Sequence, residues 1–147
     1  MSVKSKLNKL KGEQILSSNK KTQTQLWEAI ADAMTDNKGE DIVLIDVSSI
    51  EETVTDTFLI CHGNSTTSVR GIAENIIEKV AETTGEKPIS KEGLDKANWI
   101  VLDYFDVVVH IFQRETREYY QLEDLWADTE IFTYDPKFNK LIKRDGE

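Results

Sequence analysis

Two apolar runs separated by a two-residue connection constrain the fold of this chain more than any other feature of its sequence. The runs occupy residues 98–103 and 106–112 and flank Tyr104 and Phe105. Apolar runs this close together predict two antiparallel strands joined by a tight turn. With the two flanked residues as the loop, three facing pairs are expected: Leu102 with Val107, Ile100 with Val109, and Trp99 with His110. A three-residue loop would instead shift the register by one and mix the two faces of the hairpin.

The two faces of this hairpin differ in composition, because side chains alternate from one face of a strand to the other. One face is entirely aliphatic and is formed by Ile100, Leu102, Val107, Val109 and Ile111. The other face combines aromatic, ionisable and small apolar side chains: Trp99, Val101, Asp103, Asp106, Val108, His110 and Phe112. Apolar side chains are most often buried, whereas charged ones rarely are. We therefore expect the aliphatic face to lie in the core and the mixed face to contact a partner.

The density of Trp, Tyr and Arg in this part of the chain is its strongest functional signal. These residue types commonly anchor protein interfaces. Seven of them fall within 28 residues: Trp99, Tyr104, Arg114, Arg117, Tyr119, Tyr120 and Trp126. A surface that recognises another protein is the favoured interpretation. Two structural alternatives stay open: Tyr119 or Leu125 packs the hairpin against a following helical turn, and His110 stacks on Trp99.

Length and composition indicate one globular domain. The chain has 147 residues, of which 39% are hydrophobic and 31% are charged, the values of a soluble protein. No apolar run approaches the roughly 18 residues needed to cross a bilayer, and the start of the chain has no apolar segment of signal-peptide type. These features predict a cytoplasmic protein that does not bind membranes. The single cysteine, Cys61, cannot form an internal disulfide, which fits a reducing compartment.

The net charge of −9 is distributed unevenly along the chain. Residues 1–22 contain six lysines and one glutamate, whereas the rest of the chain contains 12 basic and 26 acidic residues. The composition of residues 1–22 predicts a disordered basic leader. The acidic remainder of the chain should be repelled by the negatively charged phosphates of nucleic acid, because binding them needs clustered Lys or Arg side chains. A weak contact with RNA is therefore expected from the leader alone.

Periodicity predicts the remaining elements of one α/β domain over residues 23–130. The first is a helix over 24–37, with Thr22 or Thr24 as its N-cap and Gly39 as its stop. Strands over 42–47 and 57–61 follow, and then a helix that begins at the cap-rich residues 64–68 and has an apolar stripe from Val69 to Val80. A short edge strand over 88–90, the hairpin and a helical turn over 114–119 complete the order. This order predicts a mixed sheet of about five strands flanked by helices. Residues 131–147 show no clear period and are expected to be a frayed tail, part of which could dock through Ile131, Phe132, Tyr134 and Phe138.

Two adjacent residues, Cys61 and His62, suggest a metal site or a thiol nucleophile. Neighbouring strand residues point to opposite faces, so these two cannot hold one ion together. Cys61 is better explained as a small buried apolar residue. No metal or cofactor is expected.

Two further arrangements suggest enzymes. The turn at residues 62–65 precedes a predicted helix, where phosphates can bind, but it has one glycine and no Gly-Lys-Ser/Thr motif. Ser65 is therefore expected to be a helix cap. Asp103, His110 and Arg117 could form an acid–base site, yet no Ser or Cys nucleophile with a positioned base accompanies them. Catalysis is not expected.

Several blocks of the sequence resemble the ribosomal silencing factor, or Iojap-like, family. The resemblance covers residues 24–128 and rests on the segments DIVLIDV at 41–47, Thr55-Asp56 with the strand after it, the turn at 63–68, NWIVLD at 98–103, DVVVHIF at 106–112 and REYYQLEDLW at 117–126. Phe105 departs from the family, because many relatives have glycine in that turn. The leader and the tail lie beyond the part that resembles the family.

The resemblance implies a small α/β domain with the shape of a nucleotidyltransferase but without its catalysis. It implies binding to the large ribosomal subunit through that subunit's protein number fourteen, which blocks joining of the small subunit and represses translation. It also implies a homodimer when the protein is free. Carried over residue by residue, the partner-binding set is Trp99, Asp103, Tyr104, His110, Phe112, Arg117, Tyr120, Leu122 and Trp126.

Two other hypotheses stay open from the sequence. One is a nucleotide-handling enzyme of nucleotidyltransferase type that uses the turn from Gly63 to Ser68. The other is a homodimer in which the aromatic face is only the self-interface. Binding of nucleotide with magnesium tests the first, and the oligomeric state of a Trp99→Ala variant tests the second.

Overall fold

A seven-stranded mixed sheet forms the centre of the protein, in the strand order β3-β4-β5-β2-β1-β6-β7. The computed structural model describes residues 25–144, so the predicted leader at residues 1–22 lies outside the described residues. The helices are α2 (Leu26–Asp36), α3 (Thr66–Thr84), α4 (Arg114–Tyr120) and the 3₁₀ helix η2 (Leu122–Trp126). The strands are β1 (Glu40–Asp46), β2 (Thr57–Gly63), β3 (Ser90–Glu92), β4 (Trp99–Asp103), β5 (Val107–Gln113), β6 (Glu130–Asp135) and β7 (Lys140–Lys143).

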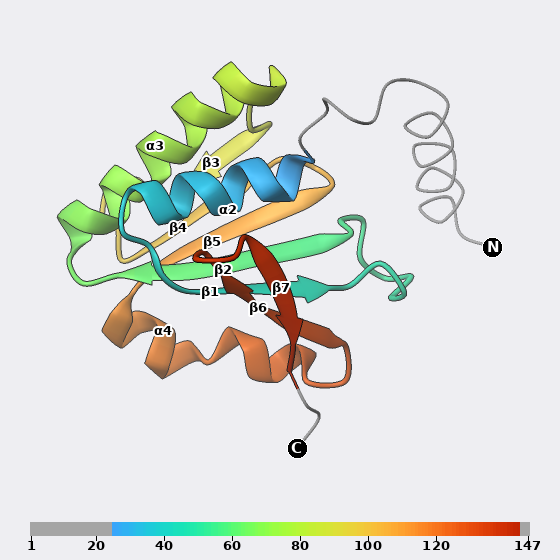
Figure 1. Ribbon diagram of the computed structural model, residues 1–147. Helices are drawn as coiled ribbons and strands as arrows, with labels where there is room; N and C mark the ends of the chain where they lie inside the picture. The colour runs from blue at the N-terminus through green and yellow to red at the C-terminus, as the bar shows by residue number, and fades with distance from the viewer. Residues whose placement is uncertain (1–24, 145–147) are drawn as a thin grey trace.

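The helices lie on opposite faces of the sheet (Figure 1). α2 and α3 cover one face, and their apolar stripes, including Ile30, Met34, Ile72 and Ile76, form the main core with it. α4 and η2 lie on the other face, over a smaller cluster that includes Val43 and other residues of β1, β2 and β5. The prediction of a mixed sheet flanked by helices is confirmed, since β2 pairs with β5 in parallel and the other strand pairs are antiparallel.

The number of strands was predicted wrongly, because two strands lie in the segment expected to be a frayed tail. β6 pairs antiparallel with the outer edge of β1, and β7 pairs with β6. Tyr134 of β6 is buried and packs edge-to-face on Trp27, with ring centroids 6.3 Å apart. Most other side chains of β6 are only partly buried, so the segment lacks a clear alternation of apolar and polar residues. Pairing with β1, which is distant in sequence, gives this segment its structure.

The two long helices form where the sequence predicted them. α2 begins after Gln25, whose backbone N–H donates to the Glu28 carboxylate, so neither threonine is its N-cap. It ends at Asp36, three residues before Gly39, where an added Cβ would lie 2.9 Å from the Met34 carbonyl oxygen. Ser65 caps α3 as predicted, and its hydroxyl accepts a hydrogen bond from the Ser68 backbone N–H at 3.1 Å.

The hairpin of β4 and β5 forms as predicted, but its register differs by two residues. Trp99 faces Phe112 rather than His110, because Tyr104 donates to the Val107 carbonyl oxygen and closes a longer connection. Side chains alternate with a period of two, so a shift of two residues leaves both faces unchanged. The aliphatic face is accordingly buried against α2 and α3, as predicted.

No helix in the described part of the chain combines the length and the apolar character that crossing a membrane requires.

Candidate partner-binding site

The mixed face of the hairpin is partly covered, contrary to the expectation that all of it faces a partner. Phe112 is fully buried, and His110 is only 9% exposed. The neighbouring strands present apolar side chains on this same face, among them Ile45 and Ile60, which would otherwise face water. α4 and η2 lie over this face, and Leu122 and Trp126 of η2 pack against the cluster that also contains Phe112 of the hairpin.

His110 holds the indole of Trp99 in place. The Nε1 group of Trp99 donates a hydrogen bond to Nδ1 of His110 at 3.1 Å. Burial lowers the pKa of His110 to about 4, so its ring is neutral at pH 7 and Nδ1 is free to accept. The two rings are tilted by 45° rather than stacked, with centroids 6.0 Å apart. His110 therefore supports the aromatic surface from beneath.

Three neighbouring aromatic rings form the part of this surface that reaches solvent, and of these Trp99 is half-buried. Trp99 contacts Tyr120 with centroids 4.9 Å apart, and Tyr120 contacts Tyr119 at 5.0 Å. Tyr119 is 81% exposed and Tyr120 is 52% exposed. We call these three residues the aromatic ridge. Tyr119 or Leu125 was expected to pack the hairpin against the following helical turn, and that expectation was wrong because both side chains are largely exposed.

Leu122 and Trp126 attach η2 to the sheet. Both are partly buried and pack against the smaller cluster. Trp126 meets the ring of Phe58 edge-on, with centroids 5.1 Å apart. The Nε1 atom of Trp126 is buried and finds no hydrogen-bond partner among the described residues. These two members of the predicted set lie at the margin of the ridge.

The hairpin turn places two other predicted residues away from the ridge. The Asp103 carboxylate accepts a hydrogen bond from the Phe105 backbone N–H at 2.8 Å, which closes the turn. Tyr104 is 3% exposed and packs in the main core on the opposite face of the sheet. Burial raises the pKa of its hydroxyl to about 12. Tyr104 therefore does not belong to the exposed surface that the sequence suggested.

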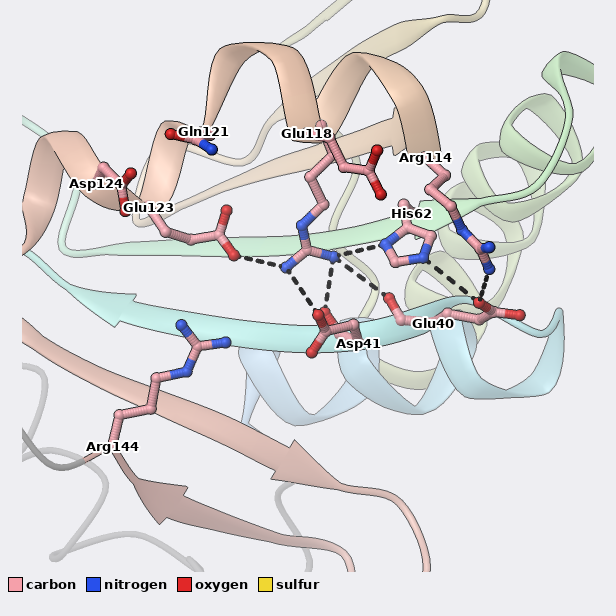
Figure 2. Close-up of a pocket in the computed structure, with 10 residues that line it drawn as sticks. Glu40, Asp41, His62, Arg114, Glu118, Gln121, Glu123, Asp124 and Arg144 are labelled. Carbon is pink, nitrogen blue, oxygen red and sulfur yellow. Dashed lines mark hydrogen bonds and ion pairs between the residues drawn. The ribbon is translucent and has the colours of Figure 1, made fainter.

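Arg117 is also buried, with 6% of its surface exposed. Its side chain lines a charged hollow formed by residues of α4, η2 and the start of β1. Figure 2 shows Glu40, His62 and Glu123 around this hollow. Nη1 donates to the Asp41 carbonyl oxygen at 2.9 Å and lies 2.9 Å from Nδ1 of His62. Nη2 donates to the Glu123 carboxylate at 2.8 Å.

Electrostatics in the hollow follow from these contacts. Burial, followed by the charge of Arg117, lowers the pKa of His62. Burial alone would raise the pKa of Glu123, but the hydrogen bond and the charge of Arg117 lower it. At the open edge, a hydrogen bond from Arg114 lowers the pKa of Glu40. The sequence did not indicate this hollow, because its residues come from segments far apart in the chain.

The residues of the other chemical arrangements considered from the sequence make structural contacts. Cys61 is fully buried, and burial raises the pKa of its thiol to about 12, as expected of an inert residue. A Cβ on Gly63 would lie 2.6 Å from the Ser68 hydroxyl, so the turn is tightly packed. Asp103 and His110 have the separate partners described above. Within residues 25–144, no group of three or more His, Cys, Asp or Glu side chains could hold a metal.

An α/β domain with a rigid sheet and an exposed aromatic ridge is typical of proteins that bind other macromolecules. Residues 20–145 match the family described as "Ribosomal silencing factor during starvation". The chain belongs to this ribosomal silencing factor family.

Individual relatives agree with this assignment. The chain is 40% identical over 118 residues to ribosomal silencing factor RsfS of Bacillus subtilis, which covers 80% of this chain and 98% of the relative. A crystal structure from Bacillus halodurans is 40% identical, with a TM-score of 0.60 and coverage of 69% of this chain and 92% of that one. A more distant relative, from mouse, is named mitochondrial assembly of ribosomal large subunit protein 1. The two sequences are 33% identical over 89 residues, which correspond to 59% of this chain and 39% of the mouse protein.

Proposed function

We propose that this protein is a ribosomal silencing factor that binds the large ribosomal subunit through protein number fourteen of that subunit. Its bulk then blocks joining of the small subunit and represses translation. Membership of the family supports the silencing role, and the name of the mouse relative supports the large subunit as the partner. The aromatic ridge is the structural observation on which the proposal depends.

The ridge has the properties of an interface anchor. Tyr and Trp contribute large contact areas, and the loss of a central one commonly weakens binding by about 2 kcal/mol or more. The indole of Trp99 is held by the hydrogen bond to His110 and by contact with the ring of Phe112, and it in turn contacts Tyr120. Such support reduces the conformational entropy lost on binding. A steric mechanism of this kind needs no cofactor. We propose that the protein acts in the cytoplasm, where it meets the large ribosomal subunit.

The members of the predicted set have different roles in this proposal. Trp99 and Tyr120 contact the partner, with Leu122 and Trp126 at the margin. His110, Phe112 and Arg117 act from beneath, and Asp103 and Tyr104 shape the hairpin turn. Tyr119 and Leu125, which lie outside the set carried over from the family, add to the contact surface because most of their area is exposed.

Sedimentation of a lysate through a sucrose gradient tests the proposal. We expect the wild-type protein to travel with free large subunits and Trp99→Ala to stay at the top of the gradient. Phe138→Ala is the matched control, because Phe138 is an exposed aromatic residue in the connection between β6 and β7. Equal sedimentation of wild type and Trp99→Ala would contradict the proposed surface.

Self-association is measured on the same variants. We propose that the free protein forms a homodimer and that the large subunit competes for the ridge. If Trp99→Ala changes the oligomeric state but not the association with the large subunit, the ridge is only a self-interface. Gel filtration with light scattering measures the oligomeric state directly.

A further inference from the structure

The helix that carries two rings of the aromatic ridge has no buried apolar side chain of its own. α4 has seven residues, and Arg117 is the only one that is buried. A helix this short is unstable by itself and depends on tertiary contacts. The next element, η2, has no fully buried residue and is attached by partly buried side chains. Besides the contact of Tyr120 with Trp99 and the exposed pair of Arg114 with Glu40, the position of α4 therefore depends on what the Arg117 guanidinium contacts.

Arg117 connects α4 to the beginning of β1. The pairing of β1 with β2 shifts register between Glu40 and Val43, and Asp41 within this bulge has a positive φ of 51°. The Asp41 carbonyl oxygen accepts from Nη1 of Arg117 at 2.9 Å. The same nitrogen lies 2.9 Å from Nδ1 of His62 on β2. One guanidinium thus fixes α4 to two neighbouring strands at once.

Arg117 also connects α4 to η2 across a sharp turn. α4 ends at Tyr120, and its C-cap Gln121 has the left-handed conformation with φ 47° and ψ 54°. Glu123 lies just beyond this turn, and its carboxylate accepts from Nη2 of Arg117 at 2.8 Å. Both side chains are largely buried, with 7% and 16% of their surfaces exposed. The ion pair therefore sets the angle between the two helices.

We infer that Arg117 is a positioning residue, which contacts no partner itself but holds α4 and η2 so that the aromatic ridge has its binding geometry. This inference rests on the proposed function, because the ridge is the surface that it positions. Arg117 serves here because the guanidinium is a planar fork with five donors that can bond in several directions. A lysine ammonium is a compact point charge on a flexible stem and cannot reproduce these directions.

The test compares Arg117→Lys with Arg114→Lys in the full-length protein. Arg114 lies one turn earlier on α4 and pairs with Glu40 at 3.0 Å, but its side chain is 48% exposed. Two quantities are measured: affinity for the large subunit, and amide hydrogen exchange by mass spectrometry. We expect Arg117→Lys to lose roughly tenfold in affinity, because a ridge that is no longer preorganised must be ordered on binding. Its exchange should accelerate over residues 114–126 while α3 stays protected. Arg114→Lys should resemble wild type in both measurements.

A double variant separates positioning from stability. Arg117→Met with Glu123→Gln removes both charges, so no unpaired charge is left inside the protein. We expect this variant to keep the wild-type unfolding temperature to within a few degrees, yet to exchange rapidly over residues 114–126 and to bind weakly. Wild-type binding by the double variant would overturn the inference, because only stability would then be at stake.

The remaining outcomes also decide the matter. If Arg117→Lys exchanges faster throughout the protein, Arg117 is a general stability residue and the inference fails. If exchange over residues 114–126 stays slow in both variants, α4 does not depend on Arg117 and the inference fails as well. If the wild-type protein does not bind the large subunit, the proposed function fails. The exchange pattern then still decides whether Arg117 holds α4 and η2.

Discussion

Trp99 and His110 are joined by a hydrogen bond from the indole Nε1 to Nδ1 at 3.1 Å, although their backbones are not directly opposite in the hairpin. Trp99 faces Phe112 across the strands, and His110 faces Val101. The bond thus crosses the hairpin diagonally and aims the indole toward Tyr120 on α4. The buried histidine therefore links the stability of the sheet to the shape of the aromatic ridge.

This relationship predicts that stability falls in mild acid. Burial lowers the pKa of His110 to about 4, from the ordinary value of 6.5. Between these two values the unfolded chain binds a proton at this residue and the folded protein does not, so stability is full above pH 6.5 and declines as the pH falls toward 4. At about 1.4 kcal/mol per pKa unit, the loss approaches about 3 kcal/mol.

Urea unfolding of wild type and His110→Gln at pH 7, 6, 5 and 4.5 measures this effect. Glutamine offers an acceptor to Trp99 but does not titrate in this range. The difference in unfolding free energy between the two proteins should shrink or reverse as the pH falls. Parallel curves at all four values would show that His110 does not carry the effect.

Tyr119→Ala should weaken binding to the large subunit without changing stability. Tyr119 is 81% exposed, and substitutions at exposed positions usually change stability by less than about 0.5 kcal/mol. If Tyr119 contacts the partner, its loss lowers affinity by about thirtyfold, which corresponds to about 2 kcal/mol. Binding is measured by cosedimentation and stability by thermal unfolding, with Phe138→Ala as the control. Unchanged affinity would remove Tyr119 from the contact surface.

Phe105→Gly should stabilise the hairpin turn. Phe105 has a φ of 76°, a left-handed conformation that costs a residue with a side chain about 1–2 kcal/mol. Glycine adopts this conformation freely but loses about 0.5–1 kcal/mol in chain entropy. The expected net gain is therefore about 0.5–1 kcal/mol, visible as a higher unfolding temperature. Phe105→Ala keeps the positive φ and should bring no such gain, and an equal gain in both variants would refute the role of backbone strain.

Gly63→Ala should destabilise the junction of β2 and α3. The added Cβ would lie 2.6 Å from the Ser68 hydroxyl and 3.1 Å from its Cβ, so the first turn of the helix must move. Overpacking of this kind typically costs about 1–3 kcal/mol. Gly71→Ala is the control, because it meets only the amide end of the Asn37 side chain, at 2.9 Å, and it improves helix propensity. Chemical denaturation of both variants measures the difference, and equal midpoints would contradict this account.

Local patterns predicted those features that depend on a residue and its near neighbours. The helical stripe from Val69 to Val80 and the cap at Ser65 follow from spacings of three and four residues, which report directly which face is buried. The alternation in the hairpin identified its aliphatic face in spite of the wrong register, since both registers place Ile100 and Val109 on the same side. The resemblance in residues 98–126 led to the family, which the comparisons confirmed.

Contacts between distant segments decided the rest. The register of the hairpin depended on the turn conformation at Phe105, and β6 became a strand because β1 offered it an unpaired edge. The sequence likewise could not show that His110 would be buried and Tyr119 exposed.

By itself, the sequence determined the apolar faces, the two long helices, the hairpin and the family of this protein, because periodic burial is written into neighbouring residues. Only the tertiary structure decided which aromatic side chains reach solvent and that Arg117 would be buried against Asp41 and Glu123. The physical reason is that the exposure of a side chain depends on what covers it. For the mixed face of the sheet, the cover is a short helix held by contacts that come from remote parts of the chain.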